Sequence, residues 1–112
     1  MNDHDGSAKY VIPDRLGSVL YQFYLNDYWT VDPVIAWHVV IYPKGENEYT
    51  YEPNPITVAS DGYLSEIYCI EIRVNGLAVR WEFPYDRSFT DAAEAIEYGK
   101  QQRREYDARE SD

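Results

Sequence analysis

Few residues in this chain have the type and spacing that catalysis requires. His38 lies in an apolar segment with no nucleophile or carboxylate at a useful spacing, so a hydrogen-bonded structural histidine is expected. Cys69 is expected beside Glu82 across a hairpin, and a neighbouring carboxylate raises the pKa of a thiol and makes it less reactive. Glu71 is expected opposite Arg80, which would keep its carboxyl group ionised and unable to donate a proton at neutral pH.

Motifs for nucleotide, metal or hydrolase chemistry are also missing from the sequence. The chain contains no P-loop, G-x-S-x-G, H-E-x-x-H or EF-hand pattern. One cysteine and two histidines are too few for a Cys/His metal site, and the run Asp3-His4-Asp5 is more typical of solvated sequence than of metal ligands. We therefore expect no enzyme activity, no metal and no cofactor.

The chemistry that the sequence does offer is a concentration of carboxylates and tyrosines. The 112 residues include 20 acids and 10 bases, which gives a formal charge of −10. Residues 24–72 hold eight of these acids, one base (Lys44) and seven of the 12 tyrosines. Carboxylates pair with arginine, and tyrosine gives a large rigid contact, so this segment suits an arginine-rich groove on a partner. Solubility is the alternative explanation, but that charge would also spread over the nearly balanced carboxy-terminal segment.

The candidate binding residues are acids and aromatic residues of this segment. Glu46 and Glu48 stand two residues apart, which on an extended strand corresponds to ~7 Å, close to the separation of successive backbone phosphates. Trp29 lies in an expected loop, where an exposed aromatic side chain can anchor an interface. The expected partner-binding residues are Asp27, Tyr28, Trp29, Asp32, Glu46, Glu48, Tyr49, Tyr51, Glu52, Asp61 and Glu66.

A single α+β domain over residues 16–112 is expected to position these side chains. Residues 1–15 have little apolar periodicity and predict a mobile amino-terminal arm. The expected fold is an antiparallel sheet of four to six strands with one carboxy-terminal helix packed on one face. Alternating apolar residues predict strands over 19–25, 35–42, 49–52 and 56–60, followed by a hairpin over 64–83.

The hairpin is the best-determined of these elements. Asn75-Gly76 is typical of a two-residue type I′ turn, because both central positions of that turn need a positive φ. An unbroken register from this turn places Ile70 opposite Trp81 and Glu71 opposite Arg80. One face of the hairpin would then be apolar and the other polar.

Two flanking segments complete the expected domain. Ile56 is expected opposite Tyr68, next to the first strand of the hairpin. A helix capped by Ser88 or Thr90 follows the last strand, and its basic residues, including Arg103, are expected to face solvent in salt bridges. Its expected inner stripe consists of Ala92, Ala93, Ile96, Gly99 and Tyr106.

A small, acidic, tyrosine-rich sheet domain with a single helix resembles the inhibitors that phages and mobile elements direct against host defence. It is most similar in type to anti-CRISPR proteins that act as DNA mimics, and the stretch from Arg87 to Ala95 resembles small uncharacterised bacterial sheet-plus-helix proteins. The resemblance implies a mechanism in which carboxylates occupy the Lys/Arg groove of a CRISPR effector or nuclease and block recognition of target DNA without chemistry. It transfers no residue roles.

The expected partner is therefore a basic nucleic-acid-binding protein, such as a CRISPR effector subunit or a nuclease. Direct nucleic-acid binding is not expected from so acidic a chain, and neither is membrane insertion, because no apolar run approaches ~20 residues. The polar start, Met1 to Lys9, lacks the features of a secretory signal, so a cytoplasmic monomer or weak dimer is expected.

Two other functions remain open at this point. An acidic immunity or antitoxin protein that blocks a basic nuclease toxin would use the same surface chemistry. A small ligand-binding domain or enzyme could instead use the sheet face around His38 and Tyr42, and a deep pocket there would be the discriminating observation.

Overall fold

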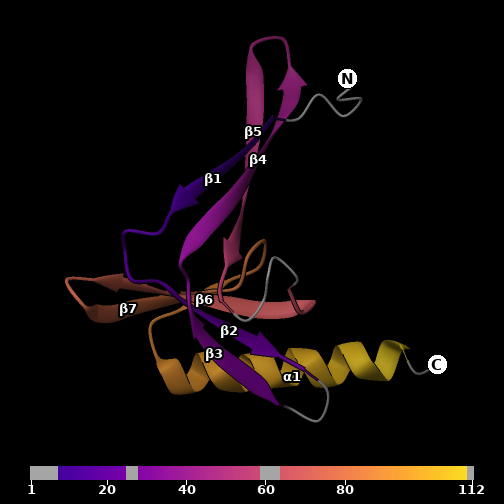
Figure 1. Ribbon diagram of the computed structural model, residues 1–112. Helices are drawn as coiled ribbons and strands as arrows, with labels where there is room; N and C mark the ends of the chain where they lie inside the picture. Colours follow the sequence, from indigo (N-terminus) through magenta and orange to yellow (C-terminus); the bar gives the residue numbers. More distant parts are fainter. Residues whose placement is uncertain (1–7, 25–27, 59–63, 111–112) are drawn as a thin grey trace.

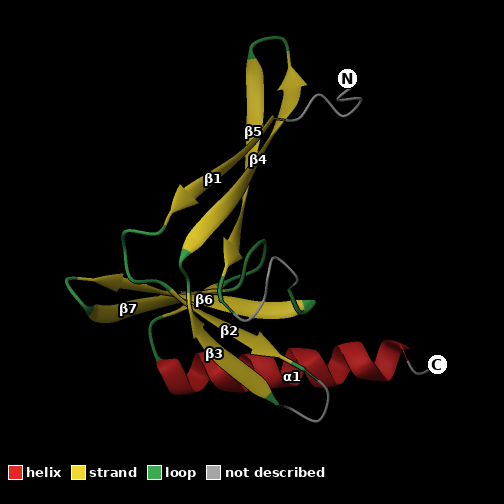
Figure 2. Cartoon of the chain, viewed as in Figure 1, coloured by secondary structure: helices red, strands yellow, loops and turns green. Residues whose placement is uncertain are grey.

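The chain forms eight antiparallel strands in two sheets and one helix within residues 8–24, 28–58 and 64–110, which this computed structural model describes (Figures 1 and 2). An α+β fold with a carboxy-terminal helix on a sheet is confirmed, but the strands divide between two sheets instead of one. The elements in chain order are β1 (Ala8–Pro13), β2 (Val19–Phe23), β3 (Trp29–Pro33), β4 (Ala36–Gly45), β5 (Glu48–Ile56), β6 (Ile67–Val74), β7 (Leu77–Glu82), β8 (Ser88–Phe89) and α1 (Ala92–Glu110).

Sheet B, with strand order β3-β2-β6-β7-β8, has helix α1 packed on one face. Between them lies a core of buried residues: Phe23, Cys69, Trp81, Phe83 and Ala95. Asp91 caps the helix by accepting the Glu94 N–H at 3.0 Å, so the expected caps Ser88 and Thr90 are wrong, and Ser88 belongs to β8. No helix in the described part of the chain is long and apolar enough to cross a membrane.

The buried stripe of the helix differs from the expected one. It contains Ala95, Gly99 and Arg103, each four residues apart, whereas Ala93 is exposed. Gly99 allows the helix to approach the sheet closely, because a Cβ at this position would lie 2.3 Å from the ring of Phe23. The expectation that Arg103 faces solvent is wrong, since it is 7% exposed.

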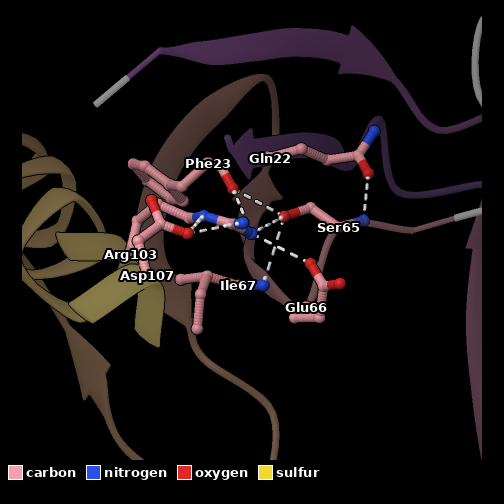
Figure 3. A network of polar contacts seen from close by, with 7 residues as sticks. All are labelled: Gln22, Phe23, Ser65, Glu66, Ile67, Arg103 and Asp107. Carbon is pink, nitrogen blue, oxygen red and sulfur yellow. Dashed lines mark hydrogen bonds and ion pairs between the residues drawn. The ribbon is translucent and has the colours of Figure 1, made fainter. Parts of the chain in front are cut away.

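The buried Arg103 connects the second half of the helix to the residues just before β6 through hydrogen bonds and ion pairs (Figure 3). Its guanidinium pairs with Asp107 at 2.8 Å and with Glu66 at 2.9 Å. It also lies 3.5 Å from the carbonyl oxygen of Phe23 and from Ser65 Oγ, which itself donates to that carbonyl at 2.6 Å. A guanidinium with this many acceptors can be buried without an unpaired charge.

Sheet A, with strand order β1-β4-β5, extends away from sheet B and the helix (Figure 1). The radius of gyration of the chain is 15.5 Å, whereas a compact domain of this length would have about 13 Å. Residues 8–13 form β1, paired with β4 from Ala8 opposite Ile41 to Pro13 opposite Ala36. The expected mobile arm over 1–15 is therefore wrong for 8–13, and residues 1–7 lie outside the described part.

The β6–β7 hairpin contains a β-bulge that the expected register lacked. The Asn75-Gly76 turn is confirmed, with both residues at positive φ. Beyond it, Arg73 pairs with Ala78 but Ile72 pairs with Arg80, so Val79 is the extra residue. From there on every pairing shifts by one residue, and Glu71 lies opposite Trp81 while Ile70 lies opposite Glu82. The expected pairs Glu71 with Arg80 and Cys69 with Glu82 are therefore wrong.

Two other strand expectations are corrected. β5 pairs with β4, and β6 pairs with β2 and β7, so Ile56 lies opposite Ala36 rather than Tyr68. Trp29 was expected in a loop but begins β3, where it lies opposite Phe23 and its ring stacks on Tyr21 at 5.6 Å. Residues 29–33 therefore form an edge strand of sheet B.

Candidate functional site

The far end of the β4–β5 hairpin carries the largest group of expected contact residues. We call residues 42–52 the acidic tip; they hold three acids and one base. Glu46 and Asn47 form the turn, and Asn47 takes a φ of 62°, a value that asparagine adopts more readily than most residues. Glu46 and Glu48 are both exposed, but Glu46 lies in the turn, so strand spacing does not describe this pair.

The acidic tip has two different faces. Residues paired across antiparallel strands share a face, so Glu48 and Glu52 lie with Tyr42 on one face. Tyr49 and Tyr51 lie on the other face and are 58% and 63% exposed. The tip therefore presents Glu48, Glu52 and Tyr42 on one face and the rings of Tyr49 and Tyr51 on the other.

The remaining expected contact residues are not part of the tip. Asp32, Trp29 and the 71%-exposed Tyr28 lie on or next to β3, an edge strand of sheet B at the opposite end of the molecule from the acidic tip (Figure 1). Glu66 is held by Arg103; its backbone N–H and that guanidinium lower the pKa of the Glu66 carboxyl group. Asp27 and Asp61 lie outside the described residues.

A cleft of about 540 Å³, which no spacing in the sequence predicts, lies where the two sheets meet. One wall is the face of sheet A that carries Tyr51, and the other is the face of sheet B opposite the helix. The loop between β7 and β8 forms its rim. We call it the aromatic cleft; it is lined by Trp37, Tyr51, Pro53, Tyr68, Ile70, Ile72, Glu82, Phe83, Pro84, Tyr85, Asp86, Arg87 and Ser88.

Trp37 is held in the wall of the cleft by Asp14. The indole Nε1 of Trp37 donates to Asp14 Oδ1 at 2.8 Å, while the N–H groups of Gly17 and Ser18 donate to Oδ2 at 2.9 and 3.1 Å. Burial opposes ionisation of this carboxyl group, but the hydrogen bonds outweigh burial and lower the pKa of Asp14. The polar edge of Trp37 is thus satisfied outside the cleft.

Tyr85 occupies an unusual position on the rim. The Asp86 N–H donates to the Phe83 carbonyl at 3.1 Å and closes a turn with Pro84 second and Tyr85 third. Tyr85 has a φ of 64°, the conformation of the third residue of a type II turn, where glycine or asparagine is usual. Its side chain is nevertheless 89% exposed, so packing within the chain does not explain this strained tyrosine.

The charged groups of the cleft are mostly paired at its rim. Glu82 pairs with Arg80 at 3.0 Å, and both side chains are nearly half exposed. Asp86 accepts a hydrogen bond from the Tyr98 hydroxyl and pairs with Arg87 at 3.4 Å, while the Arg87 guanidinium lies over the Tyr98 ring at 4.8 Å. Arg87 is thus neutralised by Asp86, and Glu82 has only a solvent-exposed partner.

Tyr68 lies in the sheet B wall of the cleft. Burial raises the pKa of the Tyr68 phenol, and the charges of Tyr85 and Glu52 raise it further. Glu52 itself lies on the opposite face of sheet A from Tyr51 and does not line the cleft. His38, by contrast, lies on the opposite face of β4 from Trp37 and does not line this cavity.

No metal site accompanies these features in the parts of the chain that the structure describes: no group of three or more His, Cys, Asp or Glu side chains is arranged to hold an ion. No family model matches the sequence, and comparison with curated proteins and with solved structures finds no match.

Proposed function

We propose that this protein is a non-enzymatic inhibitor that inserts its acidic tip into the basic nucleic-acid groove of a CRISPR effector or defence nuclease and so blocks binding of target DNA. The observation that carries the proposal is the projection of the tip beyond the rest of the fold, with Glu46 and Glu48 exposed on it (Figure 1). A narrow two-stranded arm can enter a groove that the body of the protein cannot.

The composition of the tip fits such a groove. Carboxylates form charge-assisted hydrogen bonds with arginine and compete with phosphates for lysine. Tyr49 and Tyr51 add rigid aromatic area, which is typical of residues that dominate binding energy at protein interfaces. The only base of the tip is Lys44.

The proposal concerns the tip and not a continuous acidic surface. Two acids of the 24–72 segment are paired within the chain, Glu71 in the core and the exposed Glu66 with Arg103. Asp32 lies on sheet B. A short acidic hairpin would therefore replace a few phosphates of DNA, and its binding should weaken as salt rises.

The test is capture of a partner from cells that carry defence systems, followed by competition with duplex DNA. The tagged protein is expected to retain a nucleic-acid-binding effector subunit or nuclease that rising salt and duplex DNA both release. The triple variant Glu46→Gln, Glu48→Gln, Glu52→Gln should bind this partner with at least ~10-fold lower affinity, which corresponds to three contacts of about 0.5 kcal/mol each.

A matched control keeps the number of neutralised acids the same. The helix variant Glu94→Gln, Glu97→Gln, Glu110→Gln changes three exposed acids on α1, away from the tip. It should retain the partner like the wild type. Equal losses in both triple variants would show that total charge, rather than the tip, governs binding, and would overturn the proposal.

A further inference from the structure

We propose that the aromatic cleft binds one arginine side chain of the partner protein. The inference deepens the proposed function and rests on it for the nature of the partner, a basic protein whose groove presents arginines. The shape of the cleft supports it first: 540 Å³ lies within the usual size of ligand sites, about 300–1,000 Å³, and its walls are mainly aromatic and apolar.

Aromatic ring faces are the chemistry that recognises a guanidinium. Trp37, Tyr51, Tyr68 and Tyr85 all line the cleft, from four separate segments of the chain. Trp37 gives its N–H to Asp14, so it has no free polar edge to offer a neutral hydrogen-bonding ligand, whereas the ring can still stack on a cation. Arginine is the cation that most often stacks on such rings.

The carboxylates of the rim favour a positively charged ligand. Glu82 lies opposite Ile70 on the cleft face of sheet B. Its ion pair with Arg80 is exposed to solvent and therefore contributes little to stability. An incoming guanidinium can replace Arg80 at Glu82 while its planar face lies on the rings. The one cation of the lining, Arg87, is neutralised by Asp86.

The strained backbone at Tyr85 is an independent observation that points the same way. A left-handed φ at a bulky residue costs free energy, and the exposed ring recovers none of it within the chain. Strain of this kind is found where a side chain is held for a ligand. At the rim, the Tyr85 ring can close over a side chain that enters the cleft.

The probe is the blocked peptide acetyl-Gly-Arg-Gly-amide, titrated to about 10 mM because a single such contact gives only millimolar affinity. The matched control peptide carries citrulline, which keeps the shape of arginine and removes its charge. The indole N–H of Trp37 and the amides of Ile70 and Ile72 should shift in two-dimensional NMR spectra with the arginine peptide, and at least ~5-fold less affinity is expected for citrulline.

Variants separate the cleft from the acidic tip. Tyr85→Ala removes an exposed ring without changing the core and should lower the affinity for the arginine peptide at least ~3-fold. Glu46→Gln with Glu48→Gln should leave this affinity unchanged. Equal binding of citrulline, or no shift at Trp37 up to the highest concentration, would overturn the inference. If the arginine peptide does not bind while the tip variants still fail to capture the partner, the proposed function stands but the cleft has no part in it. If the peptide binds while the tip variants capture the partner like the wild type, the arginine site stands and the proposed role of the tip is wrong.

Discussion

Glu71 and Trp81 lie opposite each other across β6 and β7, and the indole Nε1 of Trp81 donates to Glu71 Oε1 at 3.0 Å. The Tyr21 hydroxyl donates to the same oxygen at 2.8 Å, and Arg73 Nε donates to Oε2 at 2.7 Å. Glu71 is only 3% exposed, so this carboxylate lies inside the layer between sheet B and the helix with each oxygen satisfied. It is a structural anion of the core and is not available to a partner.

Replacing Glu71 should therefore destabilise the protein strongly. Glu71→Gln removes the charge that strengthens all three hydrogen bonds and turns an NH₂ group toward at least one donor. A loss of about 2–4 kcal/mol in the free energy of unfolding is expected in urea denaturation. Glu82→Gln on the neighbouring strand, whose side chain is 43% exposed, is the control and should change stability by less than ~0.5 kcal/mol. Similar values for the two variants would contradict this role of Glu71.

Stability should also fall in alkaline solution. Burial, followed by the hydrogen bond to Glu71, raises the pKa of Tyr21 from 10.0 to about 12, and burial followed by the charge of Glu71 raises the pKa of Cys69 from 9.0 to about 12. Because the unfolded chain loses these protons first, their contribution is complete below pH 9 and disappears between pH 9 and 12. Urea midpoints measured across this range should decline.

Cys69→Ala provides the control for this pH dependence. The urea midpoint of the variant should decline less steeply than that of the wild type from pH 9 upward, because one of the two groups with a raised pKa is gone. The native thiol should also resist iodoacetamide at pH 8 and react only once urea unfolds the chain, since it is fully buried. Rapid alkylation of the folded protein, or identical slopes for both proteins, would contradict the buried thiol.

Gly99 should not tolerate even a methyl group. A Cβ at this position would lie 2.3 Å from the buried ring of Phe23, so Gly99→Ala forces the helix away from the sheet. Helix propensity favours alanine by about 1 kcal/mol, yet overpacking should produce a net loss of about 1–3 kcal/mol. In a double-mutant cycle, Phe23→Leu should remove most of the penalty. A Gly99→Ala variant more stable than the wild type would show that helix and sheet are not in contact here.

Tyr85 should show a conflict between stability and binding. Tyr85→Gly relieves the left-handed strain, so its unfolding free energy should equal that of the wild type or exceed it by up to ~1 kcal/mol. The same variant should bind the arginine peptide less tightly. Tyr85→Ala retains the strain and should be less stable than Tyr85→Gly. If both variants are clearly less stable than the wild type, the ring has a packing role instead.

Local patterns predicted the elements of this fold better than their pairing. The Asn75-Gly76 turn requires particular backbone angles, and those residue types reveal it. The bulge at Val79 has no such signal, because Val79 suits either position in a strand, yet it places Trp81 on the same face as Glu71 instead of the face of Ile70. The division into two sheets likewise depends on long-range pairing of β1 with β4.

The candidate site was predicted in part for the same reason. Charge and composition identified the acidic tip, since Glu46 lies in a turn and Glu48 directly follows it, and such turns are exposed. The aromatic cleft joins residues from both sheets and the β7–β8 loop, and no sequence spacing connects them. One signal was available: a tyrosine directly after Pro84 takes a turn position where glycine is usual, and Tyr85 could have been identified from it.

Hydrogen exchange of the protein in complex with its captured partner is the decisive measurement of whether the acidic tip enters the groove. Insertion of the tip should slow the exchange of backbone amides at residues 42–52, with little change along the solvent side of α1. Addition of duplex DNA should restore fast exchange at the tip, because DNA and tip occupy one groove. Protection confined to the helix or to β3, with the tip exchanging as in the free protein, would contradict insertion of the tip.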